Sequence, residues 1–203
     1  MKRNGIMMLW SLFIVLFLLS GCATMETSQK PYEVTPKRTV IYGGEFEFAL
    51  PPSGWNIFWP EGAGSGEFAF GFIKSDPGGF PSQSVFAYDE DPFGTSTELD
   101  VREKEFLKRF LWNAILTFET LEKKKVQVLG GEGLEVLVEG KNSIAKEKAK
   151  AKIIFGKRGD RVIAFYITQW RPMDGTYDPS AFEIFDKFVN SFKFLRKSFY
   201  ETL

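Results

Sequence analysis

The side chains best suited to acid–base or metal chemistry are gathered in one acidic stretch. Asp89, Glu90 and Asp91 follow one another, and Asp100 comes shortly afterwards. Their oxygens could bind Ca²⁺, although the spacing does not match an EF-hand and such a site needs about six placed oxygens or more. Two of these carboxyl groups could instead act as a hydrolytic pair if they faced one cleft. We predict a solvated loop before a helix, whose dipole favours acidic side chains.

Histidine is absent from the 203 residues, and this absence limits the possible chemistry. It removes the commonest general base near neutral pH and the commonest metal ligand. A Ser-His-Asp triad and an ordinary zinc site are therefore excluded. We expect no catalytic residue, no metal and no cofactor, and we predict that the protein is not an enzyme.

Aromatic side chains offer one candidate binding surface, because the chain holds 22 Phe and 5 Trp. Such side chains can line a pocket for an apolar ligand or a sugar, or form a partner surface. In strands they more often fill the core. The candidate partner or ligand surface consists of Trp55, Trp59, Phe80, Phe93 and Trp170.

A basic stripe forms a second candidate surface. Its lysines alternate with other residues and are Lys146, Lys148, Lys150 and Lys152. The stripe could contact anionic lipid headgroups or an acidic partner. We favour the simpler interpretation that it is the solvated side of a strand, where lysine also discourages edge-to-edge pairing.

The first 22 residues have the layout of a bacterial export signal. Lys2 and Arg3 precede an apolar run, Ile6 to Leu19, that is short for a membrane span. The run ends in Leu19-Ser20-Gly21-Cys22, which resembles the bacterial lipoprotein signal, a small-residue site followed by a cysteine. The resemblance implies cleavage before Cys22, with lipid added to its sulfur and to the new amino terminus. An uncleaved signal anchor with an idle cysteine is the alternative.

The cysteine and the residue after it indicate where the protein is placed. Cys22 is the only cysteine, so no intramolecular disulfide can form. Two or more acyl chains hold a protein stably at a membrane, whereas one binds marginally. Because Ala23 and not Asp follows, the resemblance implies an outer membrane location facing the periplasm if the host has two membranes. We expect a lipid-anchored protein of the cell envelope.

The composition fits one globular domain behind this anchor. Basic and acidic residues are balanced at 26 each, which gives no electrostatic case for binding nucleic acid. A polar stretch with prolines follows the cysteine and is typical of a flexible tether. The predicted organisation is a signal peptide over 1–21, a tether over 22–38, one domain over 39–196 and a tail over 197–203.

Alternating and aromatic-rich runs predict a sheet. Short turns join the runs, which favours antiparallel pairing of neighbouring strands. The expected strands cover residues 40–50, 55–59, 67–73, 84–88, 125–129, 134–139, 147–155 and 161–170.

Two amphipathic helices should cover this sheet. A capping box at Thr97–Asp100 begins the first helix, and its apolar face runs from Leu99 to Phe118. Asp178 caps the second helix and Pro179 takes its first position. The predicted fold class is α+β, a mostly antiparallel sheet of about six to seven strands packed against two amphipathic helices.

The opening and closing segments of this domain carry a resemblance to a family. Phe46-Glu47-Phe48-Ala49-Leu50-Pro51-Pro52-Ser53-Gly54-Trp55 is similar to the opening strand, proline turn and tryptophan of the PsbP-like fold. The segment Phe182 to Phe194 is similar to its final helix. The family includes the extrinsic photosystem II protein, its bacterial relatives and DcrB-like lipoproteins. The resemblance implies a noncatalytic accessory or assembly role and transfers no active-site residues.

Several functions remain open at this point. The first is a lipid-anchored, noncatalytic envelope protein that acts as an accessory or assembly factor by binding an envelope protein partner. The alternative is a lipoprotein that binds a small molecule in an apolar pocket with a few convergent polar groups. A third is a hydrolase that uses carboxylates alone.

Overall fold

The computed structural model describes residues 32–42, 46–58, 69–78, 81–89, 96–114, 117–159 and 161–195. The chain divides into two units, Met1–Glu33 and Val34–Leu203, and nearly all described residues belong to the second unit. None of the helices in these described ranges is long and apolar enough to span a membrane. The predicted lipidation site at Cys22 lies outside the described residues.

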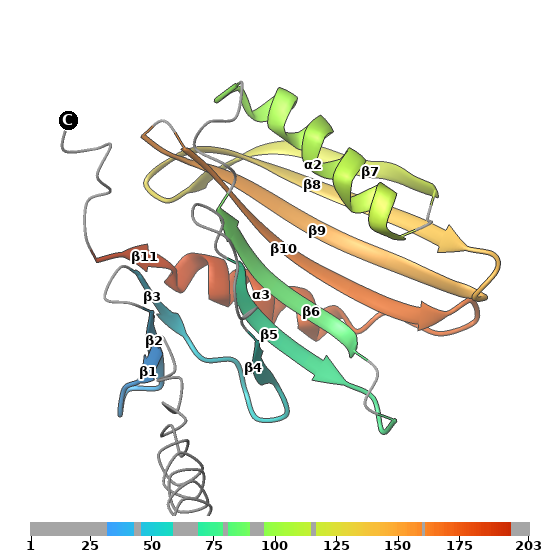
Figure 1. Cartoon of the computed structure of the whole chain (residues 1–203), viewed down its shortest axis with the longest axis horizontal. Coiled ribbons are helices and arrows are strands. Elements are labelled where there is room, and N and C mark those ends of the chain that lie inside the picture. Colours follow the sequence, from blue (N-terminus) through green and yellow to red (C-terminus); the bar gives the residue numbers. More distant parts are fainter. Residues whose placement is uncertain are drawn as a thin grey trace, which may run out of the picture. The chain divides into compact units, whose positions relative to one another are not determined.

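The described strands form two sheets (Figure 1). The larger sheet has seven strands in the order β4-β5-β6-β10-β9-β8-β7, and every neighbouring pair is antiparallel. Its strands are β4 (Asn56–Phe58), β5 (Ala69–Ser75), β6 (Pro81–Asp89), β7 (Thr117–Val128), β8 (Gly131–Asn142), β9 (Glu147–Arg158) and β10 (Arg161–Pro172). The smaller sheet has the order β1-β2-β3-β11, with β1 (Tyr32–Val34), β2 (Thr39–Tyr42), β3 (Phe46–Ala49) and β11 (Lys193–Phe194).

Two helices, α2 (Leu99–Ala114) and α3 (Pro179–Ser191), pack on opposite faces of the seven-stranded sheet (Figure 1). On β9, Phe155 contacts Phe106 of α2, with ring centroids 5.6 Å apart. Lys152 of the same strand contacts Asp186 of α3. Side chains an odd number of positions apart point to opposite faces of a strand, so the helices lie on opposite sides. The predicted α+β class, with two helices on a mostly antiparallel sheet, is confirmed.

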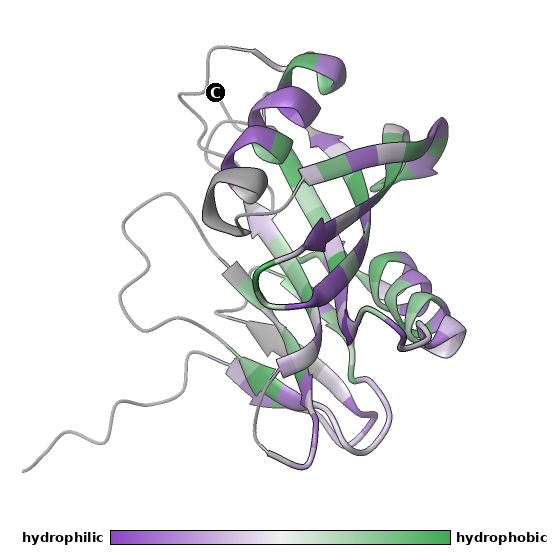
Figure 2. Ribbon diagram, turned by 90° about the vertical axis from the view of Figure 1, so that its right-hand side faces the viewer, coloured by the Kyte–Doolittle hydropathy of each residue, from purple (hydrophilic) through white to green (hydrophobic). Residues whose placement is uncertain are grey.

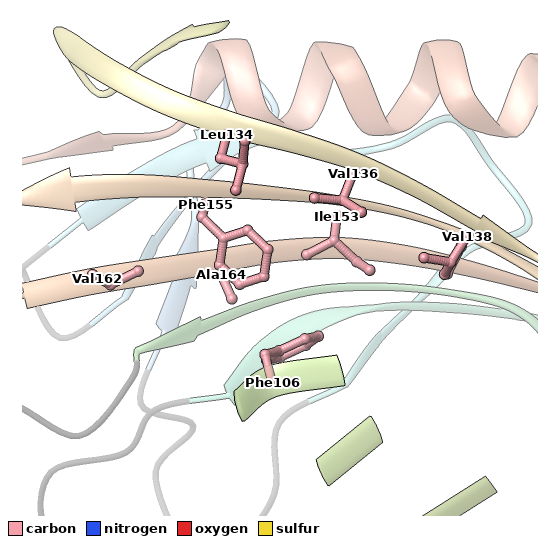
Figure 3. Packing of buried hydrophobic residues seen from close by; sticks show 9 residues of the cluster. Phe106, Leu134, Val136, Val138, Ile153, Phe155, Val162 and Ala164 are labelled. Carbon is pink, nitrogen blue, oxygen red and sulfur yellow. The ribbon is translucent and has the colours of Figure 1, made fainter. Parts of the chain in front are cut away.

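The apolar core beneath α2 is built by alternation along the strands, which carry hydrophobic and hydrophilic residues in turn (Figure 2). Phe106 of α2 lies against side chains from β8, β9 and β10 (Figure 3). Ile153 and Phe155 are fully buried there, as the alternation along β9 predicts. The buried members of this cluster are Phe106, Leu134, Val136, Val138, Ala151, Ile153, Phe155, Val162 and Ala164.

Part of the opposite face is sealed by phenylalanines from β3, β5, β10 and the C-terminal end of α3. We call this cluster the aromatic half of the α3 face. The Phe48 ring lies 4.8 Å from Phe70, and the Phe192 ring lies 5.0 Å from Phe165. Tilted and edge-to-face pairs of this kind are favourable beyond the area that they bury. The members, all buried, are Phe46, Phe48, Phe70, Phe72, Phe165, Phe188 and Phe192.

The helix α3 begins as the sequence predicts. The Oδ1 of Asp178 accepts a hydrogen bond from the backbone N–H of Ser180 at 3.0 Å, and Pro179 takes the first helical position. This satisfies one of the donors that a helix start leaves unpaired. At the other end, Ser191 Oγ accepts from Ala49 N–H of β3 at 2.9 Å, which fixes the small sheet to the helix.

The first helix is shorter than its apolar spacing predicts. It ends at Ala114, and Phe118, expected on the helix, belongs to β7. The predicted strand at 125–129 is correspondingly too short, because β7 pairs with β8 along Thr117–Val128. A Cβ at Gly140 would lie 2.8 Å from the Phe118 ring, so this glycine lets the ring pack against β8. Backbone pairing of the segment from Thr117 onward with β8 therefore outweighs the apolar spacing, which predicted a helix through Phe118.

The predicted strand over residues 40–50 is also wrong, because this segment holds two strands. β2 and β3 pair antiparallel, with Thr39 opposite Ala49 and Tyr42 opposite Phe46. Gly43 and Gly44, a pair typical of turns, separate the two strands in the sequence.

The start of α2 also differs from the predicted capping box at Thr97. The hydroxyl that accepts a hydrogen bond there is Ser96 Oγ, from the Glu98 N–H at 3.0 Å.

Candidate functional site

The rest of the α3 face, on β8 and β9, carries charged side chains. The strand register places Glu139 opposite Lys150 and Lys141 opposite Lys148. Residues that are directly opposite on paired strands share a face of the sheet. We call this surface the charged half of the α3 face, and it consists of Glu135, Glu139, Lys141, Lys148, Lys150 and Lys152.

Lys152 connects the charged half to α3. Its Nζ lies 2.6 Å from Asp186 Oδ1 and 3.5 Å from Glu135 Oε2. Lys124 of β7 approaches the other carboxylate oxygen of Glu135, at 3.0 Å. The Lys152 and Glu135 side chains are each 14% exposed, so this network is partly shielded from water. Its charges are matched by neighbouring residues, which makes it a structural element.

Three lysines farther along the same face have no such partner. Among the described residues, no carboxylate forms an ion pair with Lys141, Lys148 or Lys150. Instead, Lys148 Nζ lies 5.2 Å and Lys150 Nζ 5.6 Å from the centroid of the Tyr177 ring. Cations at this distance from an aromatic ring are attracted to its face. The ring therefore holds two ammonium groups together on a half-buried surface.

A hydrogen-bonded loop places the Tyr177 ring beneath the ammonium groups of Lys148 and Lys150. Arg171 Nε donates to Thr176 O at 3.1 Å, and Arg171 Nη1 donates to Ser82 O at 3.1 Å. The fully buried Gln169 accepts from the Asp178 N–H at 2.8 Å and donates to the Asp178 carbonyl at 2.9 Å. Buried polar groups with both partners satisfied hold a loop in one conformation. The loop before α3 is thus fixed to the end of β10.

The hydroxyl of Tyr177 is buried and lies beside the Glu139 carboxylate. Burial raises the pKa of this hydroxyl, the adjacent Glu139 carboxylate raises it further, and Arg171 lowers it. The hydroxyl therefore keeps its proton at physiological pH.

A cleft of about 360 Å³ opens next to Glu139. It lies where the start of β7 pairs with the end of β8, and it is lined by Thr117, Phe118, Glu119, Glu139, Gly140 and Lys141. A smaller cleft of about 260 Å³ lies beside Lys152 and Asp186. Charged side chains line both clefts, which suits polar groups of a binding partner better than an apolar small molecule.

The aromatic surface predicted from the sequence is only partly described. Trp55 is half-buried before β4, and Trp170 is half-buried on β10. Two strands, β5 and β6, separate β4 from β10, and no ring contact joins these two tryptophans. The structure therefore does not bring Trp55 and Trp170 together. The other predicted members, Trp59, Phe80 and Phe93, lie outside the described residues.

The lysine stripe has a different setting from the one expected. β9 lies between β10 and β8, so its lysines do not protect a sheet edge, and that part of the interpretation is wrong. Lys148, Lys150 and Lys152 do point away from the apolar core. Lys146 lies at the turn before β9, with a left-handed backbone φ of 55°.

The acidic stretch is also partly described. Asp89 ends β6, Glu90 and Asp91 lie outside the described residues, and Asp100 forms an ion pair with Lys123 at 2.6 Å. In the described ranges no three acidic, cysteine or histidine side chains are grouped so that they could hold a metal ion.

Sequence reasoning missed Tyr177, Glu139 and Lys141 as members of the site. Tyr177 directly precedes the predicted Asp178 cap, which was the one signal that its loop would be fixed. The contacts of its ring with β9 depend on how the loop after β10 folds back, and local pattern does not contain that information.

No protein-family model matches the chain, and no curated protein is similar to it in sequence. Several solved structures are similar to it at low identity. The Ran-binding protein Mog1p of Saccharomyces cerevisiae is 14% identical, with 76% of this chain and 93% of that chain covered and a TM-score of 0.49. The PsbP protein (CyanoP) of Synechocystis sp. PCC 6803 is 14% identical, with 75% and 88% covered and a TM-score of 0.49.

LpqN of Mycobacterium tuberculosis, described as involved in cell envelope biogenesis, is 13% identical, with 73% of this chain and 82% of that chain covered and a TM-score of 0.44. A PsbP protein and a protein involved in cell envelope biogenesis are thus among the solved structures similar to this chain. With these TM-scores below 0.5, the likenesses carry no conclusion about function.

Proposed function

We propose that this chain is a lipid-anchored, noncatalytic accessory protein of the cell envelope that binds another protein through the charged half of the α3 face. The observation that carries the binding role is a group of three lysines without carboxylate partners among the described residues, Lys148 and Lys150 beside the Tyr177 ring and Lys141 opposite Lys148. The anchor is inferred from Leu19-Ser20-Gly21-Cys22, and Ala23 favours an outer membrane location facing the periplasm if the host has two membranes.

The physical features of this face suit a protein interface. Tyrosine is enriched at such interfaces whereas lysine is depleted, so the lysines would act mainly through charge, because complementary charges guide the encounter of two partners. Tyr177 is fixed by the loop that Arg171 holds, so little ordering is required on binding. The neighbouring network around Lys152 supplies a rigid base. The face is therefore prepared for a partner with the opposite charge.

The alternative, a small-molecule carrier, needs a concave apolar pocket. The cleft beside Glu139 has a ligand-like volume of about 360 Å³, but Glu119, Glu139 and Lys141 are among the residues that line it. This lining favours the protein-binding proposal over the carrier.

Crosslinking in living cells tests the proposed function. The full chain with a C-terminal tag is crosslinked with formaldehyde, the envelope is solubilised, and proteins that copurify are identified. The expected result is one discrete envelope partner with the unaltered chain, and loss of that partner with Cys22→Ala, which removes the lipid anchor. Labelling with a palmitate analogue should mark the unaltered chain and not the Cys22→Ala variant. Absence of any partner in both samples would contradict the proposal.

A further inference from the structure

We propose that the partner presents an acidic segment, with carboxylates that bind Lys141, Lys148 and Lys150 and an apolar side chain beside them. This inference rests on the proposed function and assigns the chemistry of the partner. It is built from the charges of the face, the Tyr177 ring that holds two of the lysines together, and two exposed apolar residues at the same end of the sheet.

The positively charged lysines of this face lie close enough to repel one another. Lys141 and Lys148 are directly opposite each other on β8 and β9, where like charges destabilise the pair. Lys150 is opposite Glu139, yet no ion pair joins them. A carboxylate placed between the two strands would relieve the repulsion between the lysines. The face therefore selects an anionic group.

The Tyr177 ring holds two of these lysines close together. Lys148 Nζ and Lys150 Nζ lie 5.2 Å and 5.6 Å from the centroid of the ring. The Tyr177 hydroxyl is buried beside Glu139, so a partner would meet the ammonium groups and not this hydroxyl. Charge-assisted contacts between ammonium groups and carboxylates are stronger than neutral hydrogen bonds.

Exposed apolar side chains flank the lysines. Ile144, at the turn between β8 and β9, is 85% exposed, and Met173, after β10, is 42% exposed. The two turns are joined by a hydrogen bond from the Met173 N–H to the Lys146 carbonyl at 3.1 Å. An acidic segment with an apolar residue would cover both kinds of surface. A protein segment fits better than a flat membrane surface, because a cleft lies directly beside Lys141.

Zero-length crosslinking tests this assignment, because a carbodiimide joins lysine amines only to carboxylates in contact with them. Envelopes that contain the tagged full chain are treated with carbodiimide, and crosslinked peptides are mapped by mass spectrometry. The expected links join Lys141, Lys148 or Lys150 to Asp or Glu of the partner. Mapping of the partner links to other lysines, such as Lys104 and Lys108 on α2, would overturn the inference and leave the proposed function intact.

Charge variants test the same surface by copurification without a crosslinker, because carbodiimide and formaldehyde both react with the lysine amines that these variants remove. Lys148→Glu with Lys150→Glu should lower the yield of the copurified partner about tenfold or more, since attraction between opposite charges is replaced by repulsion between like charges. Lys104→Glu with Lys108→Glu makes the same charge change at two exposed positions and should leave the yield unchanged. The Lys148→Glu and Lys150→Glu variant places new acidic groups beside Glu139, and this charge reversal could disturb folding. Lys148→Gln with Lys150→Gln adds no acidic group there, and it should also lower the yield of the partner.

Two further readouts complete the test. Tyr177→Ala removes the ring that holds Lys148 and Lys150 together and should lower the yield by a few-fold, whereas Tyr177→Phe keeps the ring and should lower it less. Vesicles of phosphatidylglycerol with phosphatidylethanolamine test the membrane as the occupant. If the Lys148→Gln and Lys150→Gln variant loses binding to these vesicles and still copurifies the partner without a crosslinker, the face binds lipid and the inference is wrong. Absence of every partner crosslink, formaldehyde included, would contradict the proposed function itself.

Discussion

The aromatic half and the charged half of the α3 face lie side by side on one sheet and have opposite compositions. In the aromatic half, Phe48 of β3 and Phe70 of β5 are completely buried. In the charged half, Lys148 and Lys150 are half-buried and have no carboxylate partner among the described residues. The strand alternation is the same in both, so the difference comes from which side chains the sequence places toward α3.

The difference shows how one helix can seal part of a sheet and leave the rest for binding. α3 ends in the aromatic half, where Phe188 and Phe192 fill the space over β5 and β10. Toward β9 its contacts include the ion pair of Asp186 with Lys152. Burial of apolar area is the dominant stabilising term in folding, whereas half-exposed charges contribute little. Stability should therefore reside mainly in the aromatic half and binding in the charged half.

The largest effect on stability should come from the centre of the aromatic half. Phe48→Ala removes a fully buried ring that contacts Phe70, Phe72 and Phe188. The expected loss in free energy of unfolding is about 3–5 kcal/mol, measured by urea denaturation. Lys150→Ala, the matched truncation in the charged half, should cost less than about 1 kcal/mol. Equal losses for the two variants would contradict the assignment of stability to the aromatic half.

A smaller loss is expected where the loop before α3 is fixed. Gln169→Leu removes both hydrogen bonds from the Gln169 side chain to the Asp178 backbone. The N–H and the carbonyl of Asp178 then lose these partners. The expected cost is about 1–3 kcal/mol by thermal denaturation, since buried groups are left unsatisfied. The variant should also weaken partner capture, because Tyr177 precedes this anchor point. Capture at full yield would show that the loop position does not matter for binding.

The ion pairs of Lys152 should show coupling. Lys152→Met leaves Glu135 and Asp186 without their common cation. Its cost should be smaller in a Glu135→Gln background than in the unaltered chain, with a coupling of about 0.5–2 kcal/mol, because residues in one network do not act independently. A double-mutant cycle by urea denaturation measures this coupling. Additive costs would mean that the network does not support the charged half.

The smallest effect concerns the pH dependence of the α3 cap. Hydrogen bonds from Ser180 hold the pKa of Asp178 below its ordinary value of 3.8. The ionised form is favoured in the folded state, so this contribution is present above pH 3.8 and is lost as the pH falls through the lower, folded-state pKa. Asp178→Asn keeps a capping oxygen and should lose less stability than the unaltered chain on acidification. Parallel acid denaturation curves for the two proteins would contradict this.

Local chemistry predicted the second helix well and the first helix only in part. Asp178 and Pro179 mark a helix start by their own hydrogen-bonding and backbone geometry, so no distant information is needed. The end of α2 depends on the pairing of Phe118 with β8, and that competition is not visible in the apolar spacing.

The candidate site was less predictable than the fold. The alternation of Lys148, Lys150 and Lys152 gave the correct side of β9. The presence of Glu139 on that side depends on the register between two strands, and the position of Tyr177 depends on a loop anchored by Arg171. Register and loop closure are set by contacts far apart in the sequence. The predicted aromatic surface drew on residue type alone, without this information.

The central claim is that the charged half binds the partner and contributes little to folding. Lys148→Gln with Lys150→Gln tests it most directly, when thermal denaturation and copurification of the partner without a crosslinker are measured on the same full-chain protein. We predict an unfolding midpoint close to that of the unaltered chain together with loss of the partner. Retention of the partner at full yield, or a drop in stability that accounts for the loss of capture, would contradict the claim.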